Sequence, residues 1–253
     1  MAVTAISFRD QVSNINENRV VVGIRFIKKN YMIHVQIKEG ILKPQALVDE
    51  AAWKDIEKFD YNDEIEKYYV QQVNKSWNPL TLGVDYGHPQ TFNFDDLIAP
   101  EGYVVTGVRL RFAIDSLDSP QLKSGPIELQ IRVTPFDYFQ GEIMNHNQTY
   151  WISSDYRAFR NELIIENPDK PTKSSENKPD SRTNQFIRFQ ASDLKKDAGQ
   201  STVPFFDSLE AEGYPEFPLG GVGIMHRGHE GFGGFLAFRI FDLNLSNYFN
   251  DRF

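Results

Sequence analysis

The chain has 253 residues, of which 35 are acidic and 27 are basic, so its formal net charge is −8 and its pI is near 5.2. An acidic surface repels phosphate groups, and no run of Lys and Arg offsets it, which argues against nucleic acid as the main partner. The sequence contains no cysteine, which excludes disulfide bonds, thiolate metal sites and a cysteine nucleophile.

The composition favours strands over helices. Aromatic residues make up 13% of the chain, and they suit the half-buried surface of a sheet. No stretch approaches the roughly 18 apolar residues that a membrane span needs, so no span is predicted. The first residues lack the basic start and apolar run of a signal peptide, so we expect an exported protein to be a mature form.

The first pair of strands is predicted near the N-terminus. Residues 19–26 and 32–37 both alternate between apolar and polar side chains, which is the period of a strand. Gly23 lies in the middle of the first stretch. A glycine inside a strand indicates either a bulge or a place where another backbone comes close.

The next segment, residues 46–59, has two interpretations. Val48 and Ala52 lie at helical spacing in a stretch rich in Ala, Glu and Lys, which predicts a helix. The same segment holds Trp53, which corresponds in order along the chain to Trp151, whose neighbours resemble a strand or turn. Helix and strand both remain open at this point.

Two further pairs of strands follow, and they resemble the first pair. In the second pair, Val104, Thr106 and Val108 lie on one face of the first strand, with polar residues and Gly107 on the other. The predicted pairs comprise residues 103–110 with 127–132, and residues 219–224 with 236–241.

Recurring landmarks predict an internal repeat. Gly23, Gly107 and Gly221 stand 84 and 114 residues apart, and each precedes a second alternating stretch. This order predicts one β-rich domain of three repeat units. The units cover about residues 1–90, 91–185 and 186–253, and the polar stretch 167–180 forms an exposed loop between strands.

The predicted fold is therefore mainly β, with repeated antiparallel strand units and at most one or two short helices. Three units favour a pseudo-threefold assembly similar to a β-prism. A β-sandwich with duplicated halves is the alternative. The sequence pattern alone does not separate these two arrangements.

Ordered blocks of residues from about 102 to 248 resemble an insect family of secreted proteins that is known only as a domain of unknown function. The resemblance implies an extracellular protein of arthropod origin, and it implies no reaction, cofactor or binding residue. The first hundred residues lie outside it. The blocks that carry it include residues 105–109, 166–172, 179–181, 184–187, 202–207, 220–224 and 231–235.

A glycine-rich turn near the C-terminus is one candidate ligand site. Two histidines and a glutamate within five residues have the chemistry to bind a metal or a sugar hydroxyl, but the order is not that of a helical zinc motif. We therefore predict no metal and no cofactor there. The candidate ligand-binding residues of this turn are His226, Arg227, His229, Glu230 and Phe232.

Aromatic residues in a nearby loop are the second candidate. Phe205, Phe206, Tyr214 and Phe217 stand among Pro, Gly and acidic residues, where no strand core is obvious from the sequence. Exposed rings stack on sugars or anchor protein partners. The alternative is that these rings cover one end of a sheet.

The sequence therefore predicts a non-enzymatic extracellular protein that binds a glycan or a protein partner through loops at one end of a β assembly. No catalytic residues are assigned, because no nucleophile motif or paired carboxylates can be identified. The alternative is a structural component of a coat, silk or particle, which forms homo-oligomers through sheet edges. A polysaccharide hydrolase is the least favoured hypothesis.

Overall fold

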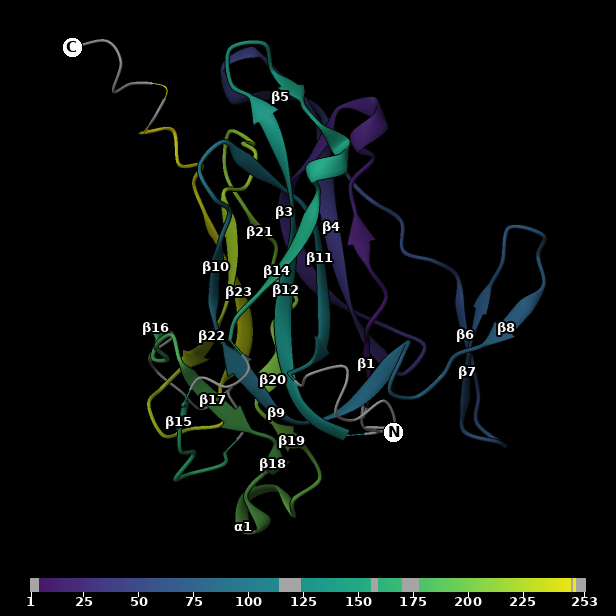
Figure 1. The fold of residues 1–253 in the computed structure, drawn as a ribbon. Helices are drawn as coiled ribbons and strands as arrows, with labels where there is room; N and C mark the ends of the chain where they lie inside the picture. Colours follow the sequence, from purple (N-terminus) through teal and green to yellow (C-terminus); the bar gives the residue numbers. More distant parts are fainter. Residues whose placement is uncertain (1–4, 114–123, 156–158, 170–177, 247, 249–253) are drawn as a thin grey trace.

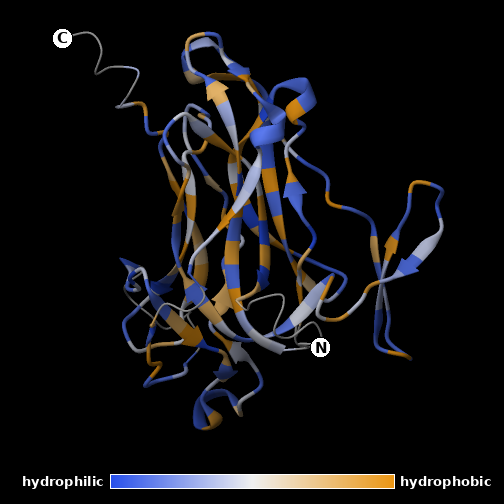
Figure 2. Ribbon diagram, viewed as in Figure 1, coloured by the Kyte–Doolittle hydropathy of each residue, from blue (hydrophilic) through white to orange (hydrophobic). Residues whose placement is uncertain are grey.

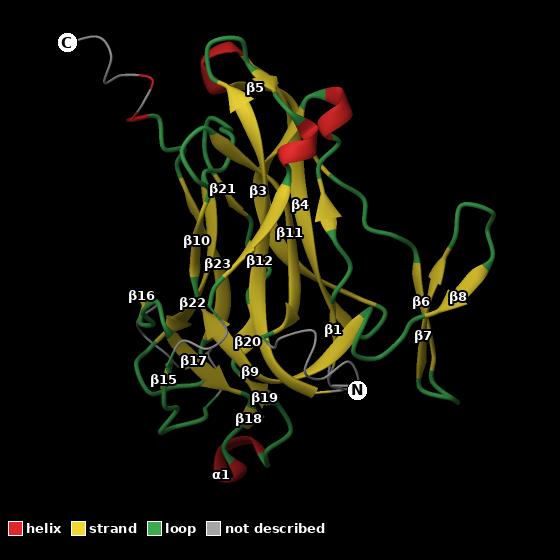
Figure 3. Ribbon diagram, viewed as in Figure 1, coloured by secondary structure: helices red, strands yellow, loops and turns green. Residues whose placement is uncertain are grey.

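We analysed a computed structural model of the chain, which describes residues 5–113, 124–155, 159–169, 178–246 and 248. The chain is mainly β, as predicted (Figure 3). The strands are β1 (Ala5–Ser7), β2 (Gln11–Val12), β3 (Arg19–Lys29), β4 (Met32–Lys43), β5 (Leu47–Trp53), β6 (Phe59–Asn62), β7 (Lys67–Gln71), β8 (Trp77–Pro79), β9 (Tyr86–Phe94), β10 (Asp96–Ile98), β11 (Tyr103–Phe112), β12 (Ser124–Asp137), β13 (Glu142–Ile143), β14 (Tyr150–Ser153), β15 (Asn161–Glu162), β16 (Lys178–Pro179), β17 (Gln185–Arg188), β18 (Gln190–Ala191), β19 (Thr202–Val203), β20 (Phe205–Phe206), β21 (Ala211–Glu212), β22 (Gly221–Gly228) and β23 (Phe235–Phe241).

The helical elements named here are short and connect strands. The α-helix α1 (Leu194–Asp197) begins after Asp193, whose carboxylate accepts hydrogen bonds from the backbone N–H groups of Lys195 and Lys196. Single 3-10 turns occupy Ile15–Glu17, Pro44–Ala46 and His146–Gln148. No helix in the described ranges is long and apolar enough to cross a membrane.

Three long antiparallel strand pairs form the body of the molecule (Figure 1). β3 pairs with β4, β11 with β12, and β22 with β23. These are the three pairs that the alternating sequence predicts, and their inward-facing residues are Val, Ile, Leu and Phe. The same alternation is visible along the strands in Figure 2.

The first strand of each pair also receives a short edge strand from elsewhere in the chain. β21 pairs with β3, β2 pairs with β11, and β10 pairs with β22. Each edge strand lies in the sequence just before one strand pair but forms hydrogen bonds with another pair. The three pairs are therefore connected by backbone hydrogen bonds as well as by their shared core.

A glycine marks the point where each edge strand approaches. Gly23 pairs with Glu212, Gly107 with Val12, and Gly223 with Asp96. Both predicted causes apply to the first two glycines, because β3 and β11 also have a bulge there. In the third pair the corresponding glycine is Gly223 and not Gly221, since Gly223 faces Asp96 on the edge strand and Arg239 across the pair.

One large hydrophobic core joins the three pairs. It contains Ile24 and Phe26 from β3, Val108 from β11, and Ile224 and other residues from β22 and β23. Backbone hydrogen bonds link the pairs through Leu219, whose N–H donates to Val21 and whose carbonyl accepts from Val105. These contacts bury all three pairs against one another.

The sheets do not close into a barrel. The largest has an open order, β2-β11-β12-β9-β1-β4-β3-β21, with further strands attached to it, and β22 and β23 belong to a separate sheet. This order does not confirm the pseudo-threefold prism. The division into three repeat units likewise stays a prediction.

The helix predicted over residues 46–59 is absent, and that prediction was wrong. Residues Leu47–Trp53 form β5, which pairs with β4. Glu50 has a positive φ of 50°, which is incompatible with a helix. Pairing with β4 therefore overrides the local helix propensity. Trp53 on β5 lies against Arg25, and Trp151 on β14 lies against Arg109. Both tryptophans are therefore strand residues, as the comparison of their positions in the sequence indicated.

The exposed loop predicted over residues 167–180 is only partly described. Its central residues, 170–177, lie outside the described residues. At its ends, Asp169 is buried and accepts a hydrogen bond from Lys196, and β16 pairs with β22. The two ends are therefore anchored to the body of the protein.

A small three-stranded sheet of β6, β7 and β8 projects from the body (Figure 1). Its inner residues Phe59, Tyr68 and Val70 pack against Met32 and Tyr86. Its outer strands β6 and β8 each pair on one side only within the described chain. Two edges of this sheet are therefore open to a partner strand.

Candidate functional site

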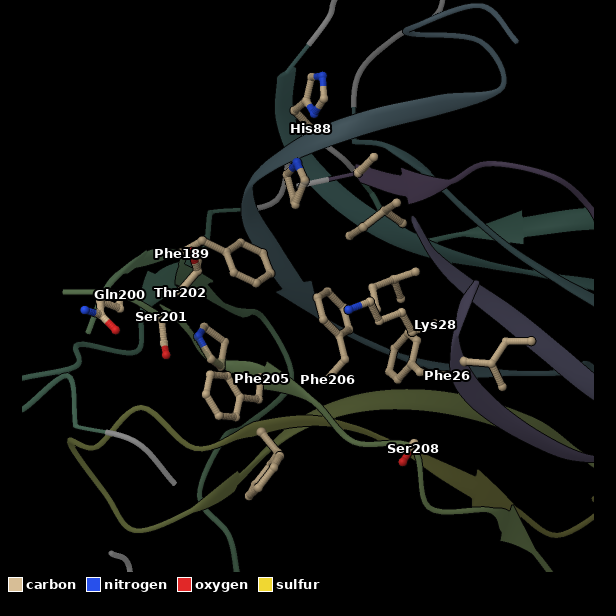
Figure 4. Close-up of a pocket in the computed structure, with 17 residues that line it drawn as sticks. Phe26, Lys28, His88, Phe189, Gln200, Ser201, Thr202, Phe205, Phe206 and Ser208 are labelled. Atoms are coloured by element: carbon tan, nitrogen blue, oxygen red, sulfur yellow. The ribbon is translucent and has the colours of Figure 1, made fainter. Parts of the chain in front are cut away.

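An apolar cavity of about 810 Å³ opens between β3, β9, β20 and the start of β23 (Figure 4). We call it the Phe206 cavity. Most of its wall is apolar, with five phenylalanine rings among the lining side chains, and polar groups contribute a minority of it. The lining residues are Ala5, Ile6, Phe26, Ile27, Lys28, Ile33, His88, Pro89, Phe189, Gln200, Ser201, Thr202, Pro204, Phe205, Phe206, Ser208 and Phe235.

Phe206 lies at the centre of the aromatic wall. Its ring contacts Phe26 edge-on at a centroid distance of 5.1 Å and stacks near Phe189 at 5.8 Å. Phe205 contacts Phe235 edge-on at 6.1 Å. Such ring pairs stabilise one another beyond the area that they bury. The wall is therefore held in place by contacts between residues from four separate segments.

Backbone pairing fixes the two rings of β20 beside the cavity. β20 runs parallel to the start of β23, and the N–H of Phe205 donates to the carbonyl of Gly234 at 2.9 Å. Asp207, which follows Phe206 in the chain, forms an ion pair with Arg227 at 2.6 Å. Arg227 was predicted to bind ligand, and in the structure it anchors the segment that carries Phe205 and Phe206.

The described part of the cavity wall differs in charge from the chain as a whole. No Asp or Glu occurs among the lining residues that the structure describes, although the chain has 35 acidic residues. Lys28 is the one Lys or Arg among these described lining residues. Within the described residues, no carboxylate oxygen lies within 4 Å of its ammonium group.

A second cavity, of about 870 Å³, lies beside the C-terminal turn and is mainly polar. His229 and Glu230 line it together with Glu162, Glu166 and Arg182. Within the described chain, no three His, Asp or Glu side chains are arranged to hold a metal ion. This cavity shares no lining residue with the Phe206 cavity.

His226 has no surface for a ligand. Its side chain is buried, with Nδ1 2.6 Å from the Asp180 carboxylate and Nε2 2.9 Å from the carbonyl of Gly233. The ring occupies the space that a Cβ on Gly234 would need. His226 therefore joins β16 and β22 to the glycine-rich turn, and both of its nitrogens are already used.

The remaining predicted residues are dispersed. Tyr214 is 100% exposed and lies outside both cavities, while Phe217 packs on the core over Gly213. Phe232 contacts the His229 ring edge-on. The turn at 226–232 and the loop at 205–217 touch through Arg227 and Asp207, but their candidate residues do not line one shared cavity. Only Phe205 and Phe206, among the nine candidates, line the apolar cavity.

Several lining residues were not predicted from the sequence. Phe26, Phe189 and Phe235 belong to segments far apart in the chain, and each fits an ordinary strand pattern. Lys28 is half of the Lys28–Lys29 doublet, one of two basic pairs in the chain. That doublet was the only local signal, and it gave no indication of apolar surroundings.

A buried cluster of charged residues lies outside both cavities. Arg160 donates to both carboxylate oxygens of Asp95, at 2.6 and 3.0 Å. Glu128 accepts a hydrogen bond from Gln130, and its other oxygen has no partner within the described residues. Burial raises the pKa of Glu128 to about 7, aided by the nearby Asp95 charge and opposed by Gln130 and Arg160.

Comparison with known proteins gives one family. The model of a domain of unknown function, DUF4803, matches residues 4–37, which run from β1 into β4. This match supports a resemblance to a domain of unknown function, but not the resemblance over residues 102–248. The matched residues lie in the first hundred, which that resemblance did not cover. The match says nothing of insect origin or of secretion. No curated protein matches the chain.

Proposed function

We propose that this chain is a non-enzymatic binding protein whose ligand site is the Phe206 cavity. The observation that carries the proposal is a mainly apolar cavity of about 810 Å³ at one end of the β assembly, with five phenylalanine rings in its wall. Small-molecule sites are typically apolar concavities of roughly 300–1,000 Å³ with a few polar groups that orient the ligand. The extracellular location is part of this proposal and rests on the sequence resemblance alone.

The lining supports binding and offers little for catalysis. The described lining residues include no carboxylate, so they do not supply the paired acid and base of a hydrolase. A ligand with an apolar body would remove both its own surface and these rings from water, which is favourable by about 25 cal/mol for each Å² buried. Sugars stack on rings too, but they also need many hydrogen bonds, and the wall has few donors and acceptors.

The proposal is tested with a neutral solvatochromic dye, Nile red, titrated against the purified chain. We expect its fluorescence to rise and saturate. In the variant Thr202→Trp, a large side chain on the exposed lining position of β19 fills the cavity, so affinity should fall about tenfold or more. Tyr214→Ala is the matched control, because Tyr214 is fully exposed and lies outside the lining.

Two results would remove the proposal. The first is a wild-type chain that does not enhance the dye at all. The second is equal affinity of wild type and Thr202→Trp, which would place the dye elsewhere. A glycan array on the same two proteins tests the sugar alternative, since a glycan signal that Thr202→Trp abolishes would assign the cavity to a carbohydrate.

Self-association is the second candidate function. The projecting sheet of β6, β7 and β8 supports it, because both outer strands are open and its rim carries exposed apolar residues. Val73 and Trp77 are 104% and 45% exposed. A second copy of the chain is the partner that this candidate requires, as in the predicted structural component.

A further inference from the structure

The described lining of the Phe206 cavity carries one lysine and no arginine, in a protein that is acidic overall. Lys28 lies near the end of β3, next to Ile27 and opposite Ile33 of β4, and all three residues line the cavity. Its side chain is drawn beside Phe206 and Phe26 in Figure 4. An aliphatic stem on an apolar wall with the charged end toward water is the usual arrangement of a lysine at such a margin.

The ammonium group of Lys28 has no carboxylate partner within the described residues, whereas two basic residues elsewhere on β3 and β4 do. Arg25, three residues earlier on β3, pairs with Glu210, and Lys38 pairs with Glu212 and Glu216. With a net charge of −8 over the chain, a lysine without an ion pair, in a wall whose described residues include no acid, is a local reversal of sign. Complementary charge of this kind selects a ligand of the opposite sign.

We infer that the cavity takes an amphipathic anion, with its apolar body among the phenylalanine rings and its carboxylate at the mouth beside Lys28. The inference rests on the proposed function and specifies its ligand class. A charge-assisted hydrogen bond from an ammonium to a carboxylate is stronger than one between neutral groups. The hydroxyls of Ser201, Thr202 and Ser208 are further donors in the same wall.

A matched pair of ligands separates the anion from its apolar body. Decanoic acid and decanol have the same chain length, and at pH 8 only the acid is charged. Each is titrated as a competitor of Nile red bound to the wild-type chain. We expect decanoic acid to bind about tenfold more tightly than decanol.

Variants then assign the preference to Lys28. Lys28→Gln should reduce the preference for the acid to near unity, and Lys28→Glu should reverse it, with decanol affinity little changed. Lys29→Gln is the control, since Lys29 is the neighbouring charge on β3 and does not line the cavity. Raised salt should weaken decanoic acid and leave decanol unaffected.

The outcomes distinguish the two claims. If neither ligand displaces the dye and the dye itself does not bind, the proposed function fails. If both bind equally, or if Lys28→Gln keeps the preference for the acid, the binding function stands and the anion inference is overturned. If Lys29→Gln abolishes the preference for the acid as fully as Lys28→Gln, the preference depends on the overall positive charge near the end of β3 and not on Lys28. The inference is then overturned as well.

Discussion

His34 and Glu128 are buried ionisable side chains that the folded protein favours in their neutral forms. His34 lies against the ring of Phe59 at 4.5 Å, and burial lowers its pKa from 6.5 to about 4. Burial raises the pKa of Glu128 from 4.5 to about 7. The two shifts have opposite consequences for the dependence of stability on pH.

The sign follows from which state binds more protons. Between about pH 4 and 6.5 the unfolded chain protonates His34 and the folded chain does not, so this residue lowers stability as the pH falls. Above pH 6.5 His34 is neutral in both states, so this loss of stability is absent there. Between about pH 4.5 and 7 the folded chain holds a proton on Glu128 that the unfolded chain has lost, so this residue lowers stability as the pH rises.

We therefore predict that the two effects largely cancel between pH 4.5 and 6.5, and that single variants expose them. In His34→Phe, the free energy of unfolding should fall with rising pH across this window relative to wild type, by about 2–3 kcal/mol. In Glu128→Gln it should rise by a similar amount. Denaturant unfolding at several pH values measures both, and profiles parallel to that of wild type would contradict the prediction.

Individual site residues were partly predictable from the sequence. Phe205 and Phe206 were identified because they are aromatic residues in a loop rich in Pro and acids, and they do line the cavity. His226 carries the most suggestive local chemistry, yet it is buried and fully bonded. Sequence reveals which side chains have chemistry, but burial decides whether they can use it, and burial depends on strands distant in the chain.

At the scale of elements, β11 shows how an edge strand constrains its neighbour. A Cβ on Gly107 would lie 2.8 Å from Cγ1 of Val12 and 3.0 Å from the carbonyl oxygen of Gln11. The first distance is shorter than real Cβ contacts and the second is at the lower limit, so Val12 or the backbone of β2 would have to shift. The glycine is needed because a second backbone approaches on that side.

We predict that Gly107→Ala destabilises the protein by about 1–3 kcal/mol, as overpacking does in other cores. Val12→Ala alone removes the closest contact atom and should cost less. In the double variant, part of the loss should be recovered, because the added methyl group then has room. Thermal or denaturant unfolding of the four proteins provides the test, and strict additivity would show that the strain arises elsewhere.

Long strands that pair with a neighbour in the sequence were predicted, and short strands that pair with a distant segment were not. The three long strand pairs were predicted because period 2 persists over many residues in each. The edge strands β2, β10 and β21 were not, since two or three residues show no period and their partners lie far along the chain. Residues 46–59 failed for a related reason, because pairing with β4 outweighed a helical spacing of side chains.

At the scale of the whole molecule, the projecting β6–β8 sheet predicts self-association at high concentration. Pairing through the open edge of β8 would bury Trp77. We expect size-exclusion chromatography with light scattering to detect dimers as concentration rises, and Trp77→Lys to abolish them. Leu209→Lys is the control, as Leu209 is exposed and lies outside this sheet. A wild-type chain that stays monomeric at every concentration would contradict the prediction.

The exchange of edge strands among the three strand pairs limits how the chain can be divided. β2 precedes the first pair but extends the second, β10 precedes the second but extends the third, and β21 precedes the third but extends the first. A fragment with one strand pair and the segment before it would therefore contain an edge strand without its partner strand. The first strand of its own pair would also lack the edge strand that pairs with it in the intact chain. Cleavage between the units should yield pieces that are unstable alone but reassemble on mixing, and the intact chain should melt in one cooperative step.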